Sequence, residues 1–319
     1  MKQFLTVHDV LQWDALVNKA LGYKASPLKD KHLGQNKKLG MVFLNPSLRT
    51  RISTQIAAKN LGMEVIVFNI DKEGWQLEFE DNAIMSGNTV EHVKEAAAVM
   101  GQYFDILGIR TFPGLKNKEE DYSEQHINQF VKYAGIPIVS LESATVHPLQ
   151  SLADVITIKE RMKKGIKSKV VMTWAPHVKA LPQAVPNSFA QWMNAWSEID
   201  FVITHPKGYE LAEEFSKNSP IEYQQDKALE GADFVYVKNW SSYKKYGKVL
   251  NSDPSWMITS KKLEATRNAK VMHCLPVRRN VVIADEVLDG PNSIVIPQAG
   301  NRVWAAQSVL SEILIASSK

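Results

Sequence analysis

The sequence contains 319 residues, about twice the length of a typical domain, so we expect two packed domains. Apolar residues make up 45% and charged residues 23%, with one cysteine, which excludes disordered, collagen-like and disulfide-stabilised proteins. The net charge of +4 is mild, and the basic stretches 29–38 and 159–169 contain few aromatic residues, so we expect no nucleic-acid partner. The sequence has no signal-peptide pattern and no apolar run near the ~20 residues of a membrane span, so we expect a cytoplasmic protein with no membrane partner.

Short apolar runs alternate with longer segments of helical spacing, the pattern of βαβ units and a parallel sheet. In the first half of the chain, strands are predicted at 39–44, 63–70, 104–109 and 137–141. In the second half, strands are predicted at 170–174, 201–204, 234–237 and 271–274, with a further strand at 293–296. The fold class is therefore α/β, with two doubly wound parallel-sheet domains; a (β/α)8 barrel is the alternative.

The join between the domains is predicted within 148–168, where Pro148 suits the first turn of a helix. A last helix is predicted from Val303 to Ser317, with its apolar side chains on one side, and it could pack on either domain. These apolar residues are Ala306, Val309, Leu310, Ile313 and Leu314.

Polar residues follow the first predicted strand. Parallel sheets bind ligands beyond the carboxyl ends of their strands, and these residues lie at such an end. The segment 45–51 reads Asn-Pro-Ser-Leu-Arg-Thr-Arg, and an apolar helical pattern with Ile52, Ile56, Ala57 and Leu61 follows until Gly62. Hydroxyls, guanidiniums and free N–H groups at a helix N-terminus favour a phosphate. The alternative is an ordinary Ser/Thr helix cap with exposed arginines.

Other predicted strands also end in cations or amides. Arg110 follows the third strand, and His147 and Gln150 follow the fourth, so these side chains are expected to converge on one crevice. Lys238 and the pair Arg278 and Arg279 follow strands of the second half, where they could hold the carboxylates of an amino-acid-like substrate. The alternatives are a surface Arg110, a structural His147 and a solvated arginine pair.

Several common site patterns are absent from the sequence. No G-x-G-x-x-G follows the first strand of either half, and no G-x-x-x-x-G-K-[ST], H-E-x-x-H or G-x-S-x-G occurs. The one cysteine cannot build a thiolate metal cage. We therefore predict no cofactor and no metal, and a reaction that depends on positioning and electrostatics. An α/β oxidoreductase, the competing enzyme class, lacks its phosphate-binding glycine loop.

Three motifs in order, Ser47-Leu48-Arg49-Thr50-Arg51, His147-Pro148-Leu149-Gln150 and His273-Cys274-Leu275-Pro276, resemble those of the aspartate/ornithine carbamoyltransferase superfamily, and the resemblance spans the chain. The Asp-x-x-x-Ser-Met-Gly motif of ordinary ornithine members is absent. The proline-rich segment 169–188 and Trp75 resemble instead the N-acylornithine branch, and within it the members that act on N-succinylornithine.

The resemblance implies transfer of the carbamoyl group from carbamoyl phosphate to the δ-amine of N2-succinyl-L-ornithine, giving N-succinyl-L-citrulline and phosphate in arginine biosynthesis. N-acetylornithine as the acceptor is the first alternative, and a catalytically silent regulatory or binding subunit is the second. The implied domains are 1–147 for carbamoyl phosphate, with the C-terminal helix 303–319 packing on it, and 148–302 for the N-acylornithine, with the active site in the interdomain cleft. The resemblance also implies a homotrimer in which Trp75 reaches the neighbouring site.

The resemblance assigns the site residues as well. Arg110, His147 and Cys274 would be catalytic, although Cys274 is not expected to be a covalent nucleophile. The carbonyl oxygen of the carbamoyl group would accept hydrogen bonds from Thr50, Arg110 and His147. The carbamoyl-phosphate-binding residues would be Ser47, Leu48, Arg49, Thr50, Trp75, Arg110, His147, Pro148, Leu149, Gln150, Cys274, Leu275 and Arg302. The N-acylornithine-binding residues would be Glu142, His177, Lys179, Lys238, Leu275, Arg278 and Arg279.

Val90 is the predicted specificity residue. In the family the matching position tends to be acidic in the acetyl branch and proline in the succinyl branch. An acidic side chain would repel the extra carboxylate of a succinyl group, and neutral Val90 does not, so the charge favours succinyl. Lys179 and Arg279 could supply a compensating cation.

Overall fold

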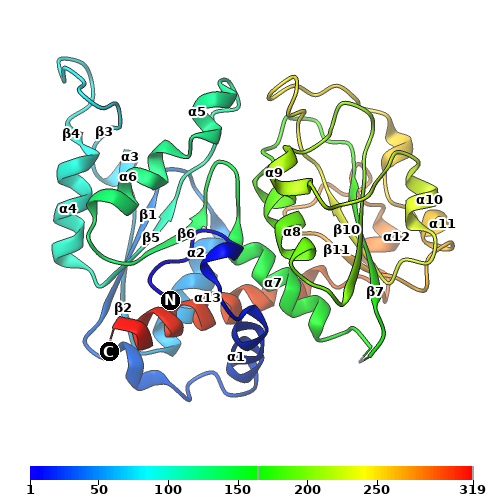
Figure 1. Ribbon diagram of the computed structural model, residues 1–319, viewed down its shortest axis with the longest axis horizontal. Coiled ribbons are helices and arrows are strands. Elements are labelled where there is room, and N and C mark those ends of the chain that lie inside the picture. Colours follow the sequence, from blue (N-terminus) through cyan, green and yellow to red (C-terminus); the bar gives the residue numbers. More distant parts are fainter. Residues whose placement is uncertain (164, 318–319) are drawn as a thin grey trace. The chain divides into compact units, whose positions relative to one another are not determined.

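The computed structural model describes residues 1–163 and 165–317 (Figure 1). The chain divides into two compact units: unit 1 comprises Met1–Gly114, Glu119–Leu152 and Arg302–Lys319, and unit 2 comprises Leu115–Lys118 and Ala153–Asn301. Residue 164 of the basic stretch 159–169, and residues 318–319 of the predicted segment 303–319, lie outside the described residues. The domain boundaries at 147/148 and 302/303 remain predictions.

Unit 1 is built on a four-stranded parallel sheet with the strand order β2-β1-β5-β6. Its strands are β1 (Lys38–Phe43), β2 (Glu64–Asn69), β5 (Ile106–Arg110) and β6 (Ile138–Glu142). Every residue of β5 and β6 is buried, as expected for strands covered on both faces of a parallel sheet. The four predicted strands of the first half are confirmed within a few residues.

Helices α4 and α6 lie side by side in unit 1 (Figure 1) and share a core with the sheet, in which Phe130 of α6 packs with Val42 and Leu107. The longer helices are α1 (Trp13–Ala25), α2 (Leu48–Asn60), α4 (Val93–Tyr103) and α6 (Gln125–Tyr133), with the C-terminal part of α13 (Val295–Ser317). Shorter elements are η1 (Val7–Asp9), η2 (Lys31–Gly34), α3 (Ile70–Glu73), β3 (Leu77–Glu78), β4 (Glu91–His92) and α5 (Lys118–Tyr122).

Helix α2 begins and ends where the sequence predicts. It ends before Gly62, whose φ of +87° is the left-handed conformation that glycine adopts readily, and a Cβ there would lie 2.1 Å from the Lys31 carbonyl oxygen. The predicted apolar face is partly wrong. Ala57 and Leu61 are buried as the pattern predicts, but Ile52 and Ile56 are exposed, and the polar Thr54 is buried.

Unit 2 contains a five-stranded parallel sheet with the order β11-β10-β7-β8-β9. Its strands are β7 (Ser168–Trp174), β8 (Ile199–Thr204), β9 (Ile221–Glu222), β10 (Phe234–Lys238) and β11 (Lys270–Met272). The two parallel sheets confirm the predicted fold class of two doubly wound α/β domains.

The predicted strand 293–296 is wrong. Ser293 forms one isolated bridge to Val271, and α13 already begins at Val295, eight residues before the predicted helix start. Pro297 lies in the first turn of this helix, where an N–H group has no intrahelical partner to lose. The fifth strand of the sheet is β9, at the edge opposite to β11, and the apolar pattern did not predict it.

The core of unit 2 includes a cluster in which Val235 and Val271 of the sheet pack with Leu229 and Val287 of flanking helices. These helices are α10 (Gln225–Leu229), which lies beside α11 (Ser260–Leu263) in Figure 1, and α12 (Asp285–Leu288). The other elements of unit 2 are α8 (Ala184–Asn194), α9 (Glu213–Ser216) and η3 (Pro254–Trp256). Helix α7 (Pro148–Lys159) belongs to unit 1 up to Leu152 and to unit 2 from Ala153. In the described part of the chain, no helix has both the length and the apolar character to cross a bilayer.

Candidate active site

Each sheet contains one point at which the strand order reverses. This switch point lies between β1 and β5 in unit 1 and between β7 and β10 in unit 2. Ligands of open parallel sheets bind beyond the carboxyl ends of the strands at such points. In unit 1, Ser47 follows β1 and Arg110 is the last residue of β5. In unit 2, His177 follows β7 and Lys238 is the last residue of β10. The sheet topology therefore points to residues that the sequence also indicated.

Arg110, the last residue of β5, is buried and ties three strand ends of unit 1 together. One terminal nitrogen donates to the carbonyl oxygens of Asn45 (2.9 Å) and Pro46 (3.1 Å), and the other donates to the Glu142 carboxylate at 2.5 Å. Glu142 was predicted to bind the N-acylornithine, but its side chain holds the Arg110 guanidinium in the structure. The carbonyls of Asn45 and Pro46 were missed by the sequence analysis because backbone acceptors leave no residue-type signal.

Arg302 brings three predicted residues together from distant parts of unit 1. Its guanidinium donates to Gln150 Oε1 at 2.8 Å and to the Thr50 hydroxyl, and it lies 3.5 Å from His147 Nε2. All four side chains are buried. We refer to these four residues, with Arg110 and Glu142, as the Arg302 cluster.

His147 carries no charge at neutral pH in this cluster. Burial lowers its pKa well below the ordinary value of 6.5, and the neighbouring Arg302 and Arg110 guanidiniums lower it further. A neutral imidazole still has one N–H group that can donate a hydrogen bond. His147 can therefore act as a donor without adding a third positive charge.

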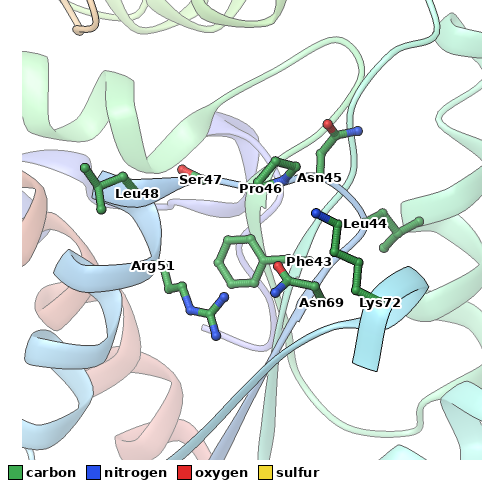
Figure 2. Close-up of a pocket in the computed structure, with 9 residues that line it drawn as sticks. All are labelled: Phe43, Leu44, Asn45, Pro46, Ser47, Leu48, Arg51, Asn69 and Lys72. Carbon is green, nitrogen blue, oxygen red and sulfur yellow. The ribbon is translucent and has the colours of Figure 1, made fainter. Parts of the chain in front are cut away.

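A cavity of about 300 Å³ opens at the carboxyl ends of β1 and β2 in unit 1. Figure 2 shows the Arg51 guanidinium and the Lys72 ammonium on two sides of Phe43, with Ser47 and Asn69 also in the lining. Ser47 precedes α2 in an extended conformation, and its hydroxyl makes no capping hydrogen bond to the helix. The expectation of an ordinary serine cap is therefore wrong for this residue, and its hydroxyl is available to a ligand.

In unit 2 the predicted acceptor-substrate residues gather around His177. Arg278 Nε donates to His177 Nε2 at 3.1 Å, and His177 Nδ1 lies 3.0 Å from the backbone oxygen of Lys179. Lys238 is buried and donates to the carbonyl oxygen of Asn239 at 3.0 Å. Burial lowers the pKa of His177, and the charges of Lys238, Arg278 and Lys179 also lower it. We refer to His177, Lys179, Lys238 and Arg278 as the Arg278 cluster.

The Arg278 cluster has an excess of positive charge. Among the side chains that the structure describes, no carboxylate forms an ion pair with Lys179, Lys238 or Arg278. A buried lysine without a counter-ion is costly unless an anion binds beside it. The arrangement is therefore suited to a ligand that carries carboxylates.

Arg279 does not join this cluster. Its guanidinium donates to Asp285 at 2.9 Å and to both carboxylate oxygens of Asp289 at 2.9 and 2.7 Å. Two carboxylates already compensate its charge, and its role as a cation for the acyl group stays a prediction. Asn239, which the sequence analysis missed, donates to the Ala175 carbonyl at 2.6 Å and joins the ends of β10 and β7.

The His273–Pro276 turn follows β11 in unit 2. Leu275 has a φ of +54°, and the Leu275–Pro276 peptide bond is cis. The Leu275 N–H donates to His273 Nδ1 at 2.8 Å, and Cys274 is half-buried. Throughout the described residues, no group of three or more His, Cys, Asp or Glu side chains is arranged to hold a metal ion.

The remaining predicted residues lie in unit 1. Pro148 begins α7 as expected, and Leu149 is buried beside it. Arg49 is half-buried in the first turn of α2, whereas Leu48 is exposed. Trp75 and Val90 are exposed, and the Trp75 indole donates to Glu91 at 2.8 Å. These last two residues thus lie on the surface of the single chain.

Comparison with protein families gives two matches. Residues 2–160 match the model described as "Aspartate/ornithine carbamoyltransferase, carbamoyl-P binding domain". Residues 183–313 match the model described as "Aspartate/ornithine carbamoyltransferase, Asp/Orn binding domain".

Curated proteins resemble the chain over nearly its whole length. The N-succinylornithine carbamoyltransferases of Bacteroides thetaiotaomicron and Bacteroides fragilis are 51% and 52% identical to it, over 98% of this chain and 99% of theirs. The N-acetylornithine carbamoyltransferase of Xanthomonas campestris pv. campestris is 32% identical over 98% of both chains.

Solved structures of N-acetyl-L-ornithine transcarbamylase are similar in fold. A glutamate-to-valine variant of that enzyme, complexed with carbamyl phosphate and N-succinyl-L-norvaline, has a TM-score of 0.91 and 32% identity, over 98% of this chain and 100% of the other. A complex of acetylornithine transcarbamylase with acetylcitrulline has a TM-score of 0.90 and 31% identity, over 98% of this chain and 99% of the other.

Proposed function

Because the chain belongs to the aspartate/ornithine carbamoyltransferase family, we propose that it transfers the carbamoyl group from carbamoyl phosphate to the δ-amine of N2-succinyl-L-ornithine. The products are N-succinyl-L-citrulline and phosphate, which would place the reaction in arginine biosynthesis. The observation that carries the choice of acceptor is the difference in identity: 51% to the N-succinylornithine carbamoyltransferase of B. thetaiotaomicron against 32% to an N-acetylornithine carbamoyltransferase.

The Arg302 cluster is suited to polarise the carbamoyl group. As the amine attacks the carbonyl carbon, negative charge develops on the carbonyl oxygen, and aligned donors stabilise it. The Thr50 hydroxyl oxygen accepts from Arg302, so its own hydrogen is free to donate to that oxygen. Arg110, held by Glu142, and neutral His147 supply further donors. We assign Ser47, Arg49 and the first N–H groups of α2 to the phosphate.

The Arg278 cluster is suited to bind the acceptor. N2-succinyl-L-ornithine carries two carboxylates, one on the α-carbon and one on the succinyl group, whereas the N-acetyl compound carries one. Lys238 and Arg278 can each pair with a carboxylate because no acidic side chain among the described residues competes for them. Lys179 is exposed at the edge of the same cluster and supplies a third cation.

Val90 supports the same choice of acceptor. The family resemblance assigns an acidic residue to this position in the acetyl branch, and such a residue would repel the succinyl carboxylate. The solved glutamate-to-valine variant of N-acetyl-L-ornithine transcarbamylase was complexed with N-succinyl-L-norvaline. Val90 presents the same neutral side chain, and it is exposed.

The transfer step needs no covalent enzyme intermediate. The amine nitrogen forms a bond to the carbonyl carbon, the bond from that carbon to the phosphate oxygen breaks, and the amine gives up a proton. Free amines with a pKa near 10 are mostly protonated at neutral pH, so the ammonium form must first release a proton to water, and desolvation beside Cys274 and the Leu275 carbonyl assists this loss before the attack. The departing phosphate can accept the second.

The test is phosphate release from carbamoyl phosphate with N-succinylornithine, N-acetylornithine, ornithine and aspartate as separate acceptors. We expect N-succinylornithine to give the highest kcat/KM, and an equal or higher value with N-acetylornithine would contradict the assigned acyl group. Val90→Glu is expected to lower kcat/KM for N-succinylornithine by about tenfold, because the added carboxylate repels the succinyl carboxylate. Val90→Gln, the matched control of the same length without the charge, should retain the activity, and it keeps the hydrogen bond from the Val90 N–H to the Gln76 carbonyl.

The same family resemblance leads us to propose a homotrimer in which Trp75 reaches the site of a neighbouring subunit. In the single chain Trp75 is 52% exposed, and Ile84 at 90% and Val90 at 64% lie exposed along the segment that follows it. Exposed apolar side chains close together in sequence favour a covered surface. The mass in solution, measured by light scattering, should equal three chains, and a monomer with full activity would rule out a shared site.

A further inference from the structure

A buried chain of hydrogen bonds runs from helix α7 to the His273–Pro276 turn within unit 2. Asp154 of α7 accepts from Gln298 Nε2 of α13 at 2.7 Å, and Gln298 Oε1 accepts from the His273 N–H at 2.9 Å. His273 Nδ1 in turn accepts from the Leu275 N–H at 2.8 Å. Asp154 and Gln298 are both fully buried, so water does not replace these bonds.

The His273 N–H fixes the orientation of the Gln298 amide. A backbone N–H only donates hydrogen bonds, so the oxygen end of the amide must face it, and the NH2 end then faces Asp154. If the amide were turned over, its NH2 group would face the His273 N–H, and two donors cannot form a hydrogen bond.

Tyr236 of β10 lies against the same residues. Burial raises the pKa of its hydroxyl well above the ordinary value, and the neighbouring Asp154 carboxylate and Cys274 thiol raise it further. A neutral hydroxyl can donate to Asp154. The Asp154 side chain is thus approached from β10 as well as from α13.

The His273–Pro276 turn needs such support. Leu275 has the left-handed φ of +54°, which is unfavourable for a residue with a Cβ atom and persists only where the surroundings hold it. In the proposed function, the attacking amine lies beside Cys274 and the Leu275 carbonyl, and the family resemblance also assigns both residues to carbamoyl phosphate. A small displacement of this turn would therefore move groups that meet the reacting atoms.

We propose that Gln298, hydrogen-bonded to Asp154, is a positioning residue for carbamoyl transfer that holds the His273–Pro276 turn in its reactive conformation. Gln298 acts through His273 and Leu275 and does not itself contact a substrate. This inference rests on the proposed function, since the turn matters to the rate only if it meets the carbamoyl group and the amine.

The chain offers a matched control in the same pair of helices. One turn further along α13, Asn301 donates to Thr157 Oγ1 of α7 and to Glu160, both at 2.9 Å. Asn301 and Thr157 are also fully buried. Thr157→Val therefore removes a buried hydrogen bond between α7 and α13 while leaving Gln298 and its partners in place.

The test compares Gln298→Met with Thr157→Val in the full chain. Both variants should lower the melting temperature by a few degrees, since each leaves buried polar groups unsatisfied. Gln298→Met should lower kcat with N-succinylornithine about tenfold to a hundredfold, because misplacement of reacting groups is costly, whereas Thr157→Val should keep kcat within about twofold. Hydrogen exchange at the His273 and Leu275 amides should become faster only in Gln298→Met.

Equal kcat values for the two variants, or unchanged exchange at His273 and Leu275 in Gln298→Met, would overturn the proposal. Gln298→Glu provides a second variant of nearly the same shape, which keeps an acceptor for His273 but cannot donate to Asp154. Its kcat should fall several-fold with its circular dichroism unchanged, and a wild-type kcat would again overturn the proposal. If the wild-type chain does not carbamoylate N-succinylornithine, the proposed function is wrong. If the wild type is active but Gln298→Met and Thr157→Val have equal kcat values, only the proposed role of Gln298 is wrong.

Discussion

The Arg302 cluster of unit 1 and the Arg278 cluster of unit 2 both lie at the carboxyl ends of parallel strands, but their positive charges are partnered differently. In the Arg302 cluster, Arg110 is paired with Glu142 at 2.5 Å, and Arg302 donates to Gln150 and Thr50. In the Arg278 cluster, Arg278 donates to a neutral histidine and Lys238 to a backbone carbonyl.

This difference separates two tasks. Buried donors that are already hydrogen-bonded to one another are held in place before any ligand arrives, and such preorganised donors stabilise charge that develops during a reaction. Cations without carboxylate partners keep their charge for a ligand, which suits the binding of an acidic substrate. We therefore expect substitutions in the Arg302 cluster to lower kcat and substitutions in the Arg278 cluster to raise KM.

The largest effect should come from Arg302→Met. This change removes the donors to Gln150 and Thr50 while keeping a long apolar side chain in a buried position. We expect kcat to fall by about 10³-fold, the upper range for loss of a preorganised donor, as measured by phosphate release. Arg267→Met, at an exposed arginine that donates to the Gly231 carbonyl, is the control and should retain kcat. A kcat of Arg302→Met within tenfold of wild type would contradict the proposal that the Arg302 cluster stabilises charge during the reaction.

A smaller effect is expected from the neighbours Arg278 and Arg279. Arg278→Met should raise the KM for N-succinylornithine about tenfold to a hundredfold, because it removes a carboxylate partner, with little change in kcat. Arg279→Met should change this KM by less than about threefold, since its guanidinium is held by Asp285 and Asp289. Equal effects of the two substitutions would support the sequence-based assignment of Arg279 to the acyl group.

The smallest effect concerns stability at low pH. The folded protein binds a proton at His147 more weakly than the unfolded chain, because the pKa of His147 is lowered from 6.5 by burial and by two arginines. The free energy of unfolding should therefore fall as the pH drops below about 6.5, by at most about 1.4 kcal/mol per pH unit for this residue. Burial also lowers the pKa values of His177 and His205 in unit 2, so these residues likewise reduce the free energy of unfolding as the pH falls.

Urea denaturation at pH 7.5 and pH 5.5 measures this contribution. His147→Gln should reduce the loss of stability between the two pH values by on the order of 1 kcal/mol, because its share of the proton uptake disappears. An unchanged pH dependence in His147→Gln would mean that His147 titrates normally, and the neutral imidazole assigned to the Arg302 cluster would then be wrong.

Most strands could be predicted from the sequence because their pattern is local. A run such as Leu39 to Leu44 is apolar whichever strand it pairs with, and so its position can be read without the fold. The segment 293–296 is equally apolar but begins a helix, since a short apolar run does not distinguish a strand from a buried helical turn. The two-residue strand β9 is too short to show any periodicity.

The site was predicted unevenly for the same reason. The family resemblance assigned Thr50, His147, Gln150 and Arg302 to one set, and the structure brings these residues together. The partners of Glu142, the two carboxylates around Arg279 and the buried link through Gln298 were not predictable. Each depends on the packing of a side chain against an element far along the chain, and no local pattern reports that packing.

The sequence by itself determined the parallel α/β class and the order of the motifs at strand ends, because apolar periodicity and motif spacing are properties of neighbouring residues. The tertiary structure decided which strands are adjacent, and so where the switch points lie. It also joined Arg302 to Thr50 across 252 positions of the chain and to Gln150 across 152, and it gave the adjacent Arg278 and Arg279 different partners. Such contacts depend on how complete helices and strands pack, because a side chain reaches only what the fold places within a few ångströms of it.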